Sequence, residues 1–269
     1  MNRTLHEIFE KLPESRWISQ PDLNPHILTL AHDSRKVGPG TLFVCMPGAT
    51  VDGHSFAAEA VKQGAVALLA EHAVAGVDSV PVLLVADVRQ AVEKLAPWFY
   101  GEPSRELRMI GVTGTNGKTT TTHIVRAIFN QAGRPCGVSG TLHTLIGERI
   151  LPVKNTTPDV LDLQAALRDM VDGGMQYVAM EVSSHALALG RVAGCEFDSA
   201  VFTNMTQDHL DFHQTLEKYR DAKAILFRQL DAPHSQKGNK SAIANVDDPA
   251  GAFMLGQSQA RCISYGIEN

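Results

Sequence analysis

The sequence predicts an α/β protein, in which a small α/β N-terminal domain is followed by a P-loop and a mostly parallel, doubly wound central domain. Short apolar runs typical of buried strands alternate with amphipathic helical patterns along the chain. A glycine-rich turn connects one of these strands to a helix, and polar residues directly follow two others. Because sheets of this type bind ligands beyond the carboxyl ends of their parallel strands, these observations also predict where a binding site lies.

The composition excludes several classes of protein. The chain has 269 residues, of which 44% are hydrophobic and 20% charged, so it can bury a core and is not disordered. Its net charge of −5 provides no basic face for nucleic acid. The N-terminus lacks the apolar region of a signal peptide, no apolar run is long enough to span a membrane, and the 4 cysteines are widely spaced. We therefore expect a cytoplasmic protein with reduced thiols, without a membrane span and without a nucleic-acid partner.

The sequence predicts two domains, at residues 1–100 and 105–269, because glycine and proline punctuate the stretch 101–104 between them. In the first domain we expect helices at 1–12, 54–64 and 88–100, and strands at 27–35, 41–45, 65–70 and 80–85. In the second domain we expect helices at 118–132, 160–171 and 216–230, and strands at 107–112, 137–141, 144–153 (with a turn at 147–148), 177–180, 199–202, 241–245 and 261–265.

The turn from Gly114 to Gly117, followed by Lys118 and Thr119, has the composition of a phosphate-binding loop. Unpaired N–H groups and the positive end of the helix dipole favour an anion there, a lysine adds a mobile charge, and a threonine hydroxyl can bind Mg²⁺. The generic P-loop pattern would need a glycine at position 112, where this chain has valine, so a shorter Gly-x-x-Gly-Lys-Thr form is present. The alternative is a glycine-rich turn without a nucleotide, but helix propensity does not explain the further hydroxyls at 120–122.

Glu181 directly follows the predicted strand at 177–180, and a carboxylate at a strand end near a phosphate loop is well placed to hold Mg²⁺ together with Thr119. A solvated strand end is the alternative interpretation. The predicted strand at 199–202 likewise delivers Asn204 to the same edge of the sheet.

The segment 208–213 concentrates two carboxylates and two imidazoles, and His209 and His213 are four residues apart, as in some zinc sites. No third soft ligand lies nearby, so a hard cation shared with phosphate suits this oxygen-rich segment better. Asp208 and Asp211 could alternatively cap a helix.

Lys223 completes the apolar spacing of Tyr219 and Leu226 on the predicted helix at 216–230, which places it on the inward face. Burial lowers the pKa of a lysine, and the neutral amine can add CO₂ to form a carbamate, an anionic metal ligand. The alternative is a lysine that snorkels to the surface past its neighbours, and the spacing alone favours this alternative.

Several motifs occur together, in order, and they are spread over the whole chain. They are Asp33-Ser-Arg35, Gly40-x-Leu-Phe-Val44, Asp52-Gly-His54, Gly114-Thr-Asn-Gly-Lys-Thr-Thr120, Asn155-Thr-Thr-Pro158, Glu181-Val-Ser-Ser-His185 and Thr203-Asn-x-x-x-Asp-His-Leu-Asp-x-His213, followed by Tyr219 and Ala222-Lys223. This combination resembles the Mur ligases and, within them, the MurE type, UDP-N-acetylmuramoyl-dipeptide:amino acid ligase. The phosphate loop alone would also fit folylpolyglutamate and cyanophycin synthetases, whereas the N-terminal motifs and the Asn155 motif favour the MurE type.

The resemblance implies an ATP-dependent ligase of peptidoglycan precursor synthesis. Such an enzyme phosphorylates the D-glutamate carboxylate of UDP-N-acetylmuramoyl-L-Ala-D-Glu to an acyl phosphate, which the amino group of meso-diaminopimelate or L-lysine then attacks. The resemblance implies that ATP phosphates lie on Gly114, Thr115, Asn116, Gly117, Lys118, Thr119 and Thr120. It also implies one Mg²⁺ on Thr119 and Glu181 and a second on His209 and a Lys223 carbamylated by CO₂, with Lys118, His209 and Lys223 as catalytic residues. The UDP substrate would be bound by Ser34, Thr156, Thr157, Ser183 and Arg191, whereas Leu189, a glutamine in some relatives, receives no role.

Mur ligases continue into a C-terminal domain that binds the amino acid, whereas this sequence stops at Asn269. We therefore expect a fragment that holds nucleotide or UDP substrate but does not complete the ligation alone. Two alternatives differ in kind: a folylpolyglutamate-type ligase, and a non-catalytic nucleotide-binding module, which would have no use for an inward lysine or for the motif at 155–158.

Overall fold

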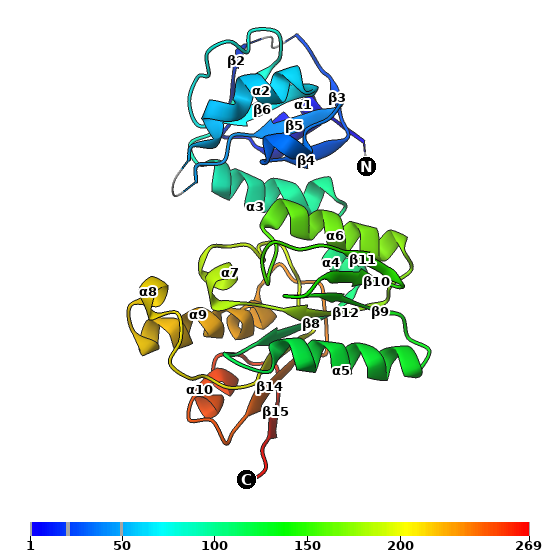
Figure 1. Cartoon of the computed structure of the whole chain (residues 1–269), viewed down its shortest axis with the longest axis vertical. Helices are drawn as coiled ribbons and strands as arrows, with labels where there is room; N and C mark the ends of the chain where they lie inside the picture. The colour runs from blue at the N-terminus through cyan, green and yellow to red at the C-terminus, as the bar shows by residue number, and fades with distance from the viewer. Residues whose placement is uncertain (1, 20–21, 49–50, 269) are drawn as a thin grey trace. The chain divides into compact units, whose positions relative to one another are not determined.

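The computed structural model describes residues 2–19, 22–48 and 51–268. The chain divides into two compact units, Met1–Gly101 and Glu102–Asn269, which are coloured from blue to cyan and from green to red in Figure 1. Each unit contains a mostly parallel sheet with helices between its strands. The predicted α/β class is therefore confirmed. None of the helices in the described part of the chain is both long and apolar enough to cross a membrane.

The first unit is built on a five-stranded sheet, in which the antiparallel strand β2 lies at one edge and the other strands run parallel. In spatial order the strands are β2 (Arg16–Ser19), β7 (Val82–Leu84), β6 (Ala65–Ala70), β5 (Thr41–Val44) and β4 (Thr29–Ala31). A separate antiparallel pair joins β1 (Arg3–Thr4) to β3 (His26–Ile27). The helices are α1 (Leu5–Lys11), α2 (Ala57–Lys62) and α3 (Val88–Phe99), with 3₁₀ turns η1 (Ser34–Lys36) and η2 (Gly53–Phe56).

Local side-chain hydrogen bonds explain where the first unit departs from the predicted elements. The helix expected at 1–12 begins only at Leu5, because Thr4 and Glu7 form a capping box. The strand expected at 27–35 ends at Ala31, and the Asp33 side chain then accepts a hydrogen bond from the Arg35 N–H to start η1. The strand β2 was not predicted.

The second unit is built on an eight-stranded sheet. In spatial order its strands are β11 (Arg149–Leu151), β10 (Thr144–Ile146), β9 (Cys136–Ser139), β12 (Tyr177–Glu181), β8 (Arg108–Thr113), β13 (Ser199–Phe202), β14 (Ser241–Asn245) and β15 (Arg261–Tyr265). The six strands from β9 to β15 in this order are parallel, and β10 and β11 are antiparallel. The turn expected at 147–148 is confirmed, because it connects β10 to β11.

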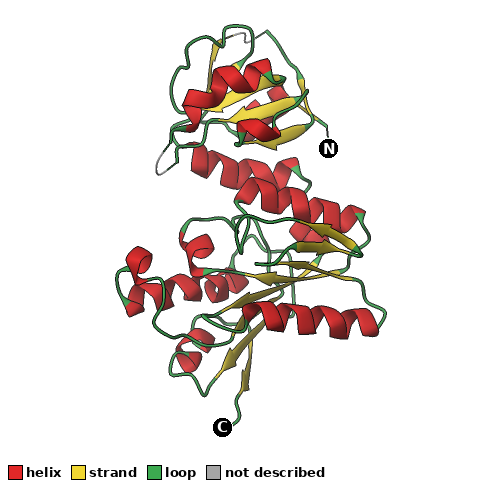
Figure 2. Cartoon of the chain, viewed as in Figure 1, coloured by secondary structure: helices red, strands yellow, loops and turns green. Residues whose placement is uncertain are grey.

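Helices cover both faces of this sheet, as Figure 2 shows for the strands drawn in yellow. One buried cluster joins Met109, Val178 and Phe202 of the strands to side chains of the helices α6 (Val160–Asp172) and α9 (Leu216–Arg228). The helix α5 (Lys118–Gln131) packs against β8, β9 and β12 and contributes nothing to that cluster, so it lies on the opposite face. This is the doubly wound arrangement that the sequence predicts.

Short helices account for most of the unpredicted structure in the second unit. α4 (Pro103–Glu106) occupies part of the expected linker, with proline at its first position. α7 (Ser184–Ala188), α8 (Leu210–His213) and α10 (Gly251–Leu255) lie in segments for which no helix or strand was predicted. The helix expected at 216–230 ends at Arg228 and continues as the 3₁₀ turn η3 (Gln229–Asp231). Helices of four or five residues carry too little periodicity to be recognised from the sequence.

The strand order places the predicted site residues at one edge. β8 lies between β12 and β13, and all three run parallel. Their carboxyl ends therefore bring together the glycine turn after β8, Glu181 at the end of β12 and Asn204 after β13.

Candidate active site

The phosphate loop connects β8 to α5, and two glycines allow its sharp turn. Gly114 has a φ of 147° and Gly117, the N-cap residue of α5, has a φ of 85°, a region that side chains rarely adopt. A Cβ atom at Gly114 would overlap the Thr203 hydroxyl at the end of β13. The glycine at this position is therefore required by both the backbone conformation and the close approach of the neighbouring strand end.

Hydrogen bonds fix the loop from both sides. The Lys118 amine folds back over the turn and donates to the carbonyl oxygens of Gly114 and Thr115, each at 2.9 Å. From β13, Thr203 donates to the Asn116 carbonyl at 2.7 Å, and the Asn204 side chain accepts from the Asn116 N–H at 2.9 Å. Burial lowers the pKa of Lys118, and the carboxylates of Glu181 and Asp208 oppose this shift. The loop is thus preformed, with a lysine amine and the N–H groups of a helix N-terminus at one point.

Glu181 is buried and makes direct contact with the phosphate-loop helix. Its Oε2 accepts a hydrogen bond from the Thr119 hydroxyl at 2.9 Å, and its two oxygens accept from the Thr141 N–H at 2.8 Å and the Thr141 hydroxyl at 3.1 Å. A Cβ atom at Gly140 would overlap this carboxylate, so glycine there leaves room for it. The alternative of a solvated strand end is wrong, because Glu181 is only 1% exposed.

The Thr119 and Glu181 oxygens fit a shared hard cation. In an octahedral Mg²⁺ site, neighbouring oxygen ligands at about 2.0–2.1 Å from the metal lie about 2.9 Å apart. The Thr119 hydroxyl and Glu181 Oε2 are 2.9 Å apart, so both can bind one ion with little movement. The donor set also suits magnesium, because it contains only oxygen.

The residues expected to bind the UDP substrate in the second unit are linked by hydrogen bonds to Glu181, directly or through a neighbouring residue. Thr157 donates to the Glu181 carbonyl oxygen at 2.9 Å and accepts from the Ser183 N–H at 3.1 Å. The Arg191 guanidinium donates to the Thr157 carbonyl at 3.2 Å, and the Thr156 hydroxyl lies 3.1 Å from that of Thr141. The structure therefore brings these four predicted residues together at the edge that carries the phosphate loop.

Lys223 is buried in α9, with 1% of its surface exposed, so the snorkelling alternative is wrong. Its amine lies 4.1 Å from the centroid of the Tyr219 ring, whose hydroxyl is 3.1 Å from the hydroxyl of Thr115 in the phosphate loop. Burial, and next the positive charge of Lys118, lower the pKa of Lys223 to about 7. A large fraction of the amine is therefore neutral near physiological pH, which is the form that can react with CO₂.

His209 lies near the same aromatic ring in an edge-on arrangement, with its ring centroid 6.2 Å from that of Tyr219. Its side chain is 48% exposed, and it adopts a left-handed backbone conformation with a φ of 52°. His213 is buried instead, so the two histidines do not present a shared zinc-binding face. Asp208 does not cap α8, because the N-cap residue of that helix is His209. The Asp208 carboxylate instead accepts a hydrogen bond from the His209 N–H at 2.9 Å.

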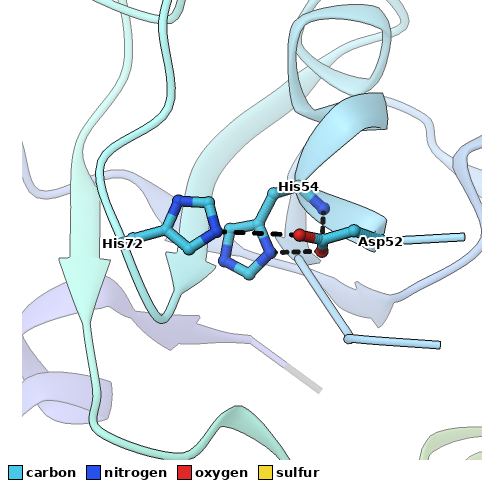
Figure 3. Close-up of side chains that lie close together, drawn as sticks. All are labelled: Asp52, His54 and His72. Atoms are coloured by element: carbon cyan, nitrogen blue, oxygen red, sulfur yellow. Dashed lines mark hydrogen bonds and ion pairs between the residues drawn. The ribbon is translucent and has the colours of Figure 1, made fainter. Parts of the chain in front are cut away.

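Ser34 belongs to the first unit, where it begins η1 after Asp33, and its role remains a prediction. That unit also contains the cluster of Asp52, His54 and His72 drawn in Figure 3, whose potential ligand atoms lie within 4.8 Å of one another. Both ring nitrogens of His54 are already engaged, since Nδ1 lies 2.6 Å from the Asp52 carboxylate and Nε2 accepts from the Glu71 N–H at 2.9 Å. Because this leaves two potential ligands, we interpret the cluster as a structural link between η2 and the end of β6.

Some residues of the site were missed by the sequence analysis. Thr141 donates two hydrogen bonds to Glu181. It follows the end of β9, so the rule that ligands bind beyond the carboxyl ends of parallel strands could have identified it. Ser184 and His213 share a buried hydrogen bond of 2.9 Å that joins α7 to α8, and no local pattern indicates it.

Comparison with known proteins identifies the family. A model of the Mur ligase middle domain matches residues 112–269, which is more than half of the chain. The chain belongs to the Mur ligase family. A second model, described as the Mur ligase family catalytic domain, matches residues 26–100. The family predicted from the motifs is therefore confirmed.

Two similar curated proteins and one solved structure carry the same name. The UDP-N-acetylmuramoyl-L-alanyl-D-glutamate–2,6-diaminopimelate ligase of Geobacillus thermodenitrificans is 50% identical over 264 residues, which cover 98% of this chain and 53% of that protein. The protein of the same name from Geobacillus kaustophilus is 52% identical over 244 residues, which cover 91% of this chain and 50% of that protein. A solved structure of a ligase of this name matches with a TM-score of 0.76 at 31% identity, covering 100% of this chain and 53% of that one. This chain spans about half the length of the curated Mur ligases that it matches.

Proposed function

We propose that this chain provides the substrate- and nucleotide-binding part of a ligase of peptidoglycan precursor synthesis, which uses ATP to add an amino acid to UDP-N-acetylmuramoyl-L-alanyl-D-glutamate. The names of two relatives support the choice of this substrate, because those relatives are 50% and 52% identical to most of this chain. The observation that carries the proposal is the direct contact of Thr119 with Glu181 at the start of the phosphate-loop helix. It is a ready-made position for the Mg²⁺ of a bound nucleotide. Because ATP and the UDP compound are cytoplasmic metabolites, we place the protein in the cytoplasm.

The loop residues would act mainly by positioning and by electrostatics. The N–H groups at the start of α5 bind the phosphates, and the Lys118 amine exchanges its loop carbonyl partners for the γ-phosphate. The D-glutamate carboxylate of the substrate then attacks that phosphorus, which gives an acyl phosphate and ADP. The amino group of the incoming amino acid displaces the phosphate to form the amide bond. The negative charge on the transferring phosphoryl group raises the energy of the transition state. Fixed cationic groups stabilise this charge and so lower the activation barrier.

Two metal positions are proposed at the same edge of the sheet. Thr119 and Glu181 would hold one Mg²⁺, and His209 with a carbamylated Lys223 would hold the second. The metal ions would neutralise phosphate charge. The surroundings of Lys223 support a carbamate, because the amine is buried and its pKa is lowered to about 7. Lys118, His209 and Lys223 are the catalytic residues in this proposal.

The UDP substrate would lie along the chain of hydroxyls beside Glu181. Ser183 and Arg191 both donate hydrogen bonds to Thr157, and Thr156 is linked to Glu181 through Thr141, which supports a shared role. Ser34 of the first unit is also proposed to bind the substrate. The guanidinium of Arg191 suits an anionic ligand. We further propose diaminopimelate as the added amino acid, because the relatives named above are diaminopimelate ligases.

Thermal-shift measurements on this chain test the proposal. We expect stabilisation by ADP with Mg²⁺ and by UDP-N-acetylmuramoyl-L-alanyl-D-glutamate, but not by folate. Stabilisation by folate without any response to the UDP compound would contradict the proposed substrate. Formation of ADP by the intact protein, with diaminopimelate and L-lysine compared, then tests the amino acid.

A further inference from the structure

His209 lies in the segment from Thr206 to Thr215, which has little regular structure of its own. The four-residue helix α8 is too short to be stable alone, and His213 is its only buried residue. Residues with positive φ flank it on both sides, His209 at 52° and Gln214 at 68°. At Gln214 the Thr215 N–H donates to the His213 carbonyl at 2.8 Å, which closes a γ-turn of a kind that is rare and strained. The surrounding structure must therefore fix this conformation.

Two contacts hold the segment at its ends. At the N-terminal end, the Thr206 N–H donates to the Thr115 hydroxyl of the phosphate loop at 3.0 Å. At the C-terminal end, Nε2 of His213 lies 2.9 Å from the Ser184 hydroxyl, and both residues are buried. Between them, Asp208 and His209 are exposed. The His209 ring also lies edge-on to the rings of His185 and Tyr219, with centroids 4.7 Å and 6.2 Å away. The two hydrogen bonds fix the backbone that carries His209 at either end.

Ser184 connects this segment to Glu181. It is the first residue of α7, three positions after Glu181, which is the last residue of β12. The hydrogen bond from His213 thus joins the segment that carries His209 to the segment that carries Glu181. We propose that His213 is a positioning residue which, through Ser184, sets the distance between the two metal positions. This inference rests on the proposed function, since it assumes that His209 binds a metal.

Hydrogen–deuterium exchange on this chain without any ligand tests the anchor itself. Ser184→Ala and His213→Leu are both expected to increase exchange in residues 208–215, because each breaks the same hydrogen bond. His213→Gln is expected to restore slow exchange, since its amide can reach the Ser184 hydroxyl. The double variant should exchange like either single variant, because the two side chains act through one bond. Lys218→Ala, which removes an exposed hydrogen bond to Gln214 at 2.6 Å, is the matched control and should leave exchange unchanged.

Binding of Mn²⁺ in the presence of ADP and bicarbonate, followed by electron paramagnetic resonance, tests the effect on the metal. We expect Ser184→Ala and His213→Leu to weaken Mn²⁺ binding about tenfold, as is typical when the support of a metal ligand is removed, with recovery in His213→Gln. Unchanged exchange in the Ser184→Ala variant, or faster exchange with unchanged Mn²⁺ affinity, would overturn the positioning role. If the unaltered chain bound neither ADP nor Mn²⁺, the proposed function would fail, and the positioning of a metal with it, whereas the exchange data would still decide whether the anchor exists.

Discussion

The Thr119 hydroxyl donates a hydrogen bond of 2.9 Å to Oε2 of Glu181, although the two residues are 62 positions apart in the sequence. The contact arises because β8 and β12 are parallel neighbours, so that the helix after one strand begins beside the end of the other. A hydroxyl and a buried carboxylate at a helix N-terminus combine a site for an anion with a site for a hard cation. This combination is what a magnesium-bound nucleotide requires.

Gly114→Ala should destabilise the second unit and weaken nucleotide binding. The added methyl group would overlap the Thr203 hydroxyl, at a φ of 147° that alanine rarely adopts. We expect a loss of roughly 2–4 kcal/mol in the free energy of unfolding, measured with urea. Gly174→Ala is the matched control, because Gly174 has a φ of 77° but open space around it, so only the backbone cost of about 1 kcal/mol applies. Equal losses in the two variants would show that the contact with Thr203 does not matter.

Lys118→Ala should remove most phosphoryl transfer in the intact enzyme. The variant loses the amine that is proposed to neutralise the γ-phosphate, and also its two hydrogen bonds across the loop. We expect the rate of ADP formation to fall by about 10²–10³-fold or more. Lys62→Ala, which alters an exposed lysine of the first unit, is the control and should retain the rate. A rate close to that of the unaltered enzyme in Lys118→Ala would refute the role of the loop lysine.

Substitutions at Lys223 should separate a carbamate from an amine. Lys223→Arg is expected to be inactive, because a guanidinium does not form a carbamate. Lys223→Ala should be inactive as well but should regain part of its activity when short carboxylic acids are added, since these can replace the missing anion. Lys118→Ala should not respond to the same acids. Normal turnover by Lys223→Arg would exclude the carbamate.

Lys223 should also make the stability of the chain depend on pH. Burial lowers its pKa from 10.5 to about 7, so between these values the unfolded chain binds a proton that the folded chain does not. Stability from this group therefore rises with pH across this window, and the cost of burying the charge is greatest below it. In bicarbonate-free buffer, Lys223→Met should exceed the unaltered chain in stability at pH 6 by on the order of 2–4 kcal/mol, and this gain should shrink towards pH 10. A gain that does not change with pH would contradict the lowered pKa.

Local patterns in the sequence were sufficient to predict much of this arrangement. The strand–turn–helix at the phosphate loop is found at the expected residues, with α5 starting at Lys118. The position of Glu181 followed from the end of a buried strand, and helical spacing placed Lys223 on the inward face, where it is buried. These features depend on periodicities of two or about 3.6 residues within a single element, which a sequence displays directly.

The features that the sequence did not predict depend on contacts between distant segments. The hydrogen bond between His213 and Ser184 joins residues 29 positions apart, and no local pattern indicates the left-handed conformation of His209. Helical spacing placed Lys223 on the inward face but favoured an amine that reaches solvent at its end. The pattern cannot show that the amine lies over the Tyr219 ring and that the whole side chain is buried. Such features are settled only when the strands are assembled into a sheet.

The most direct test of the account is isothermal titration of ADP into this chain with and without Mg²⁺, comparing the unaltered chain with Glu181→Gln. We predict that Mg²⁺ strengthens ADP binding to the unaltered chain and has little effect in the variant, because glutamine removes the negative charge that holds the ion beside Thr119. Glu217→Gln, an exposed carboxylate on α9, should behave like the unaltered chain. ADP binding that is independent of Mg²⁺ in the unaltered chain, or equally dependent on it in Glu181→Gln, would contradict a magnesium-nucleotide site at Thr119 and Glu181.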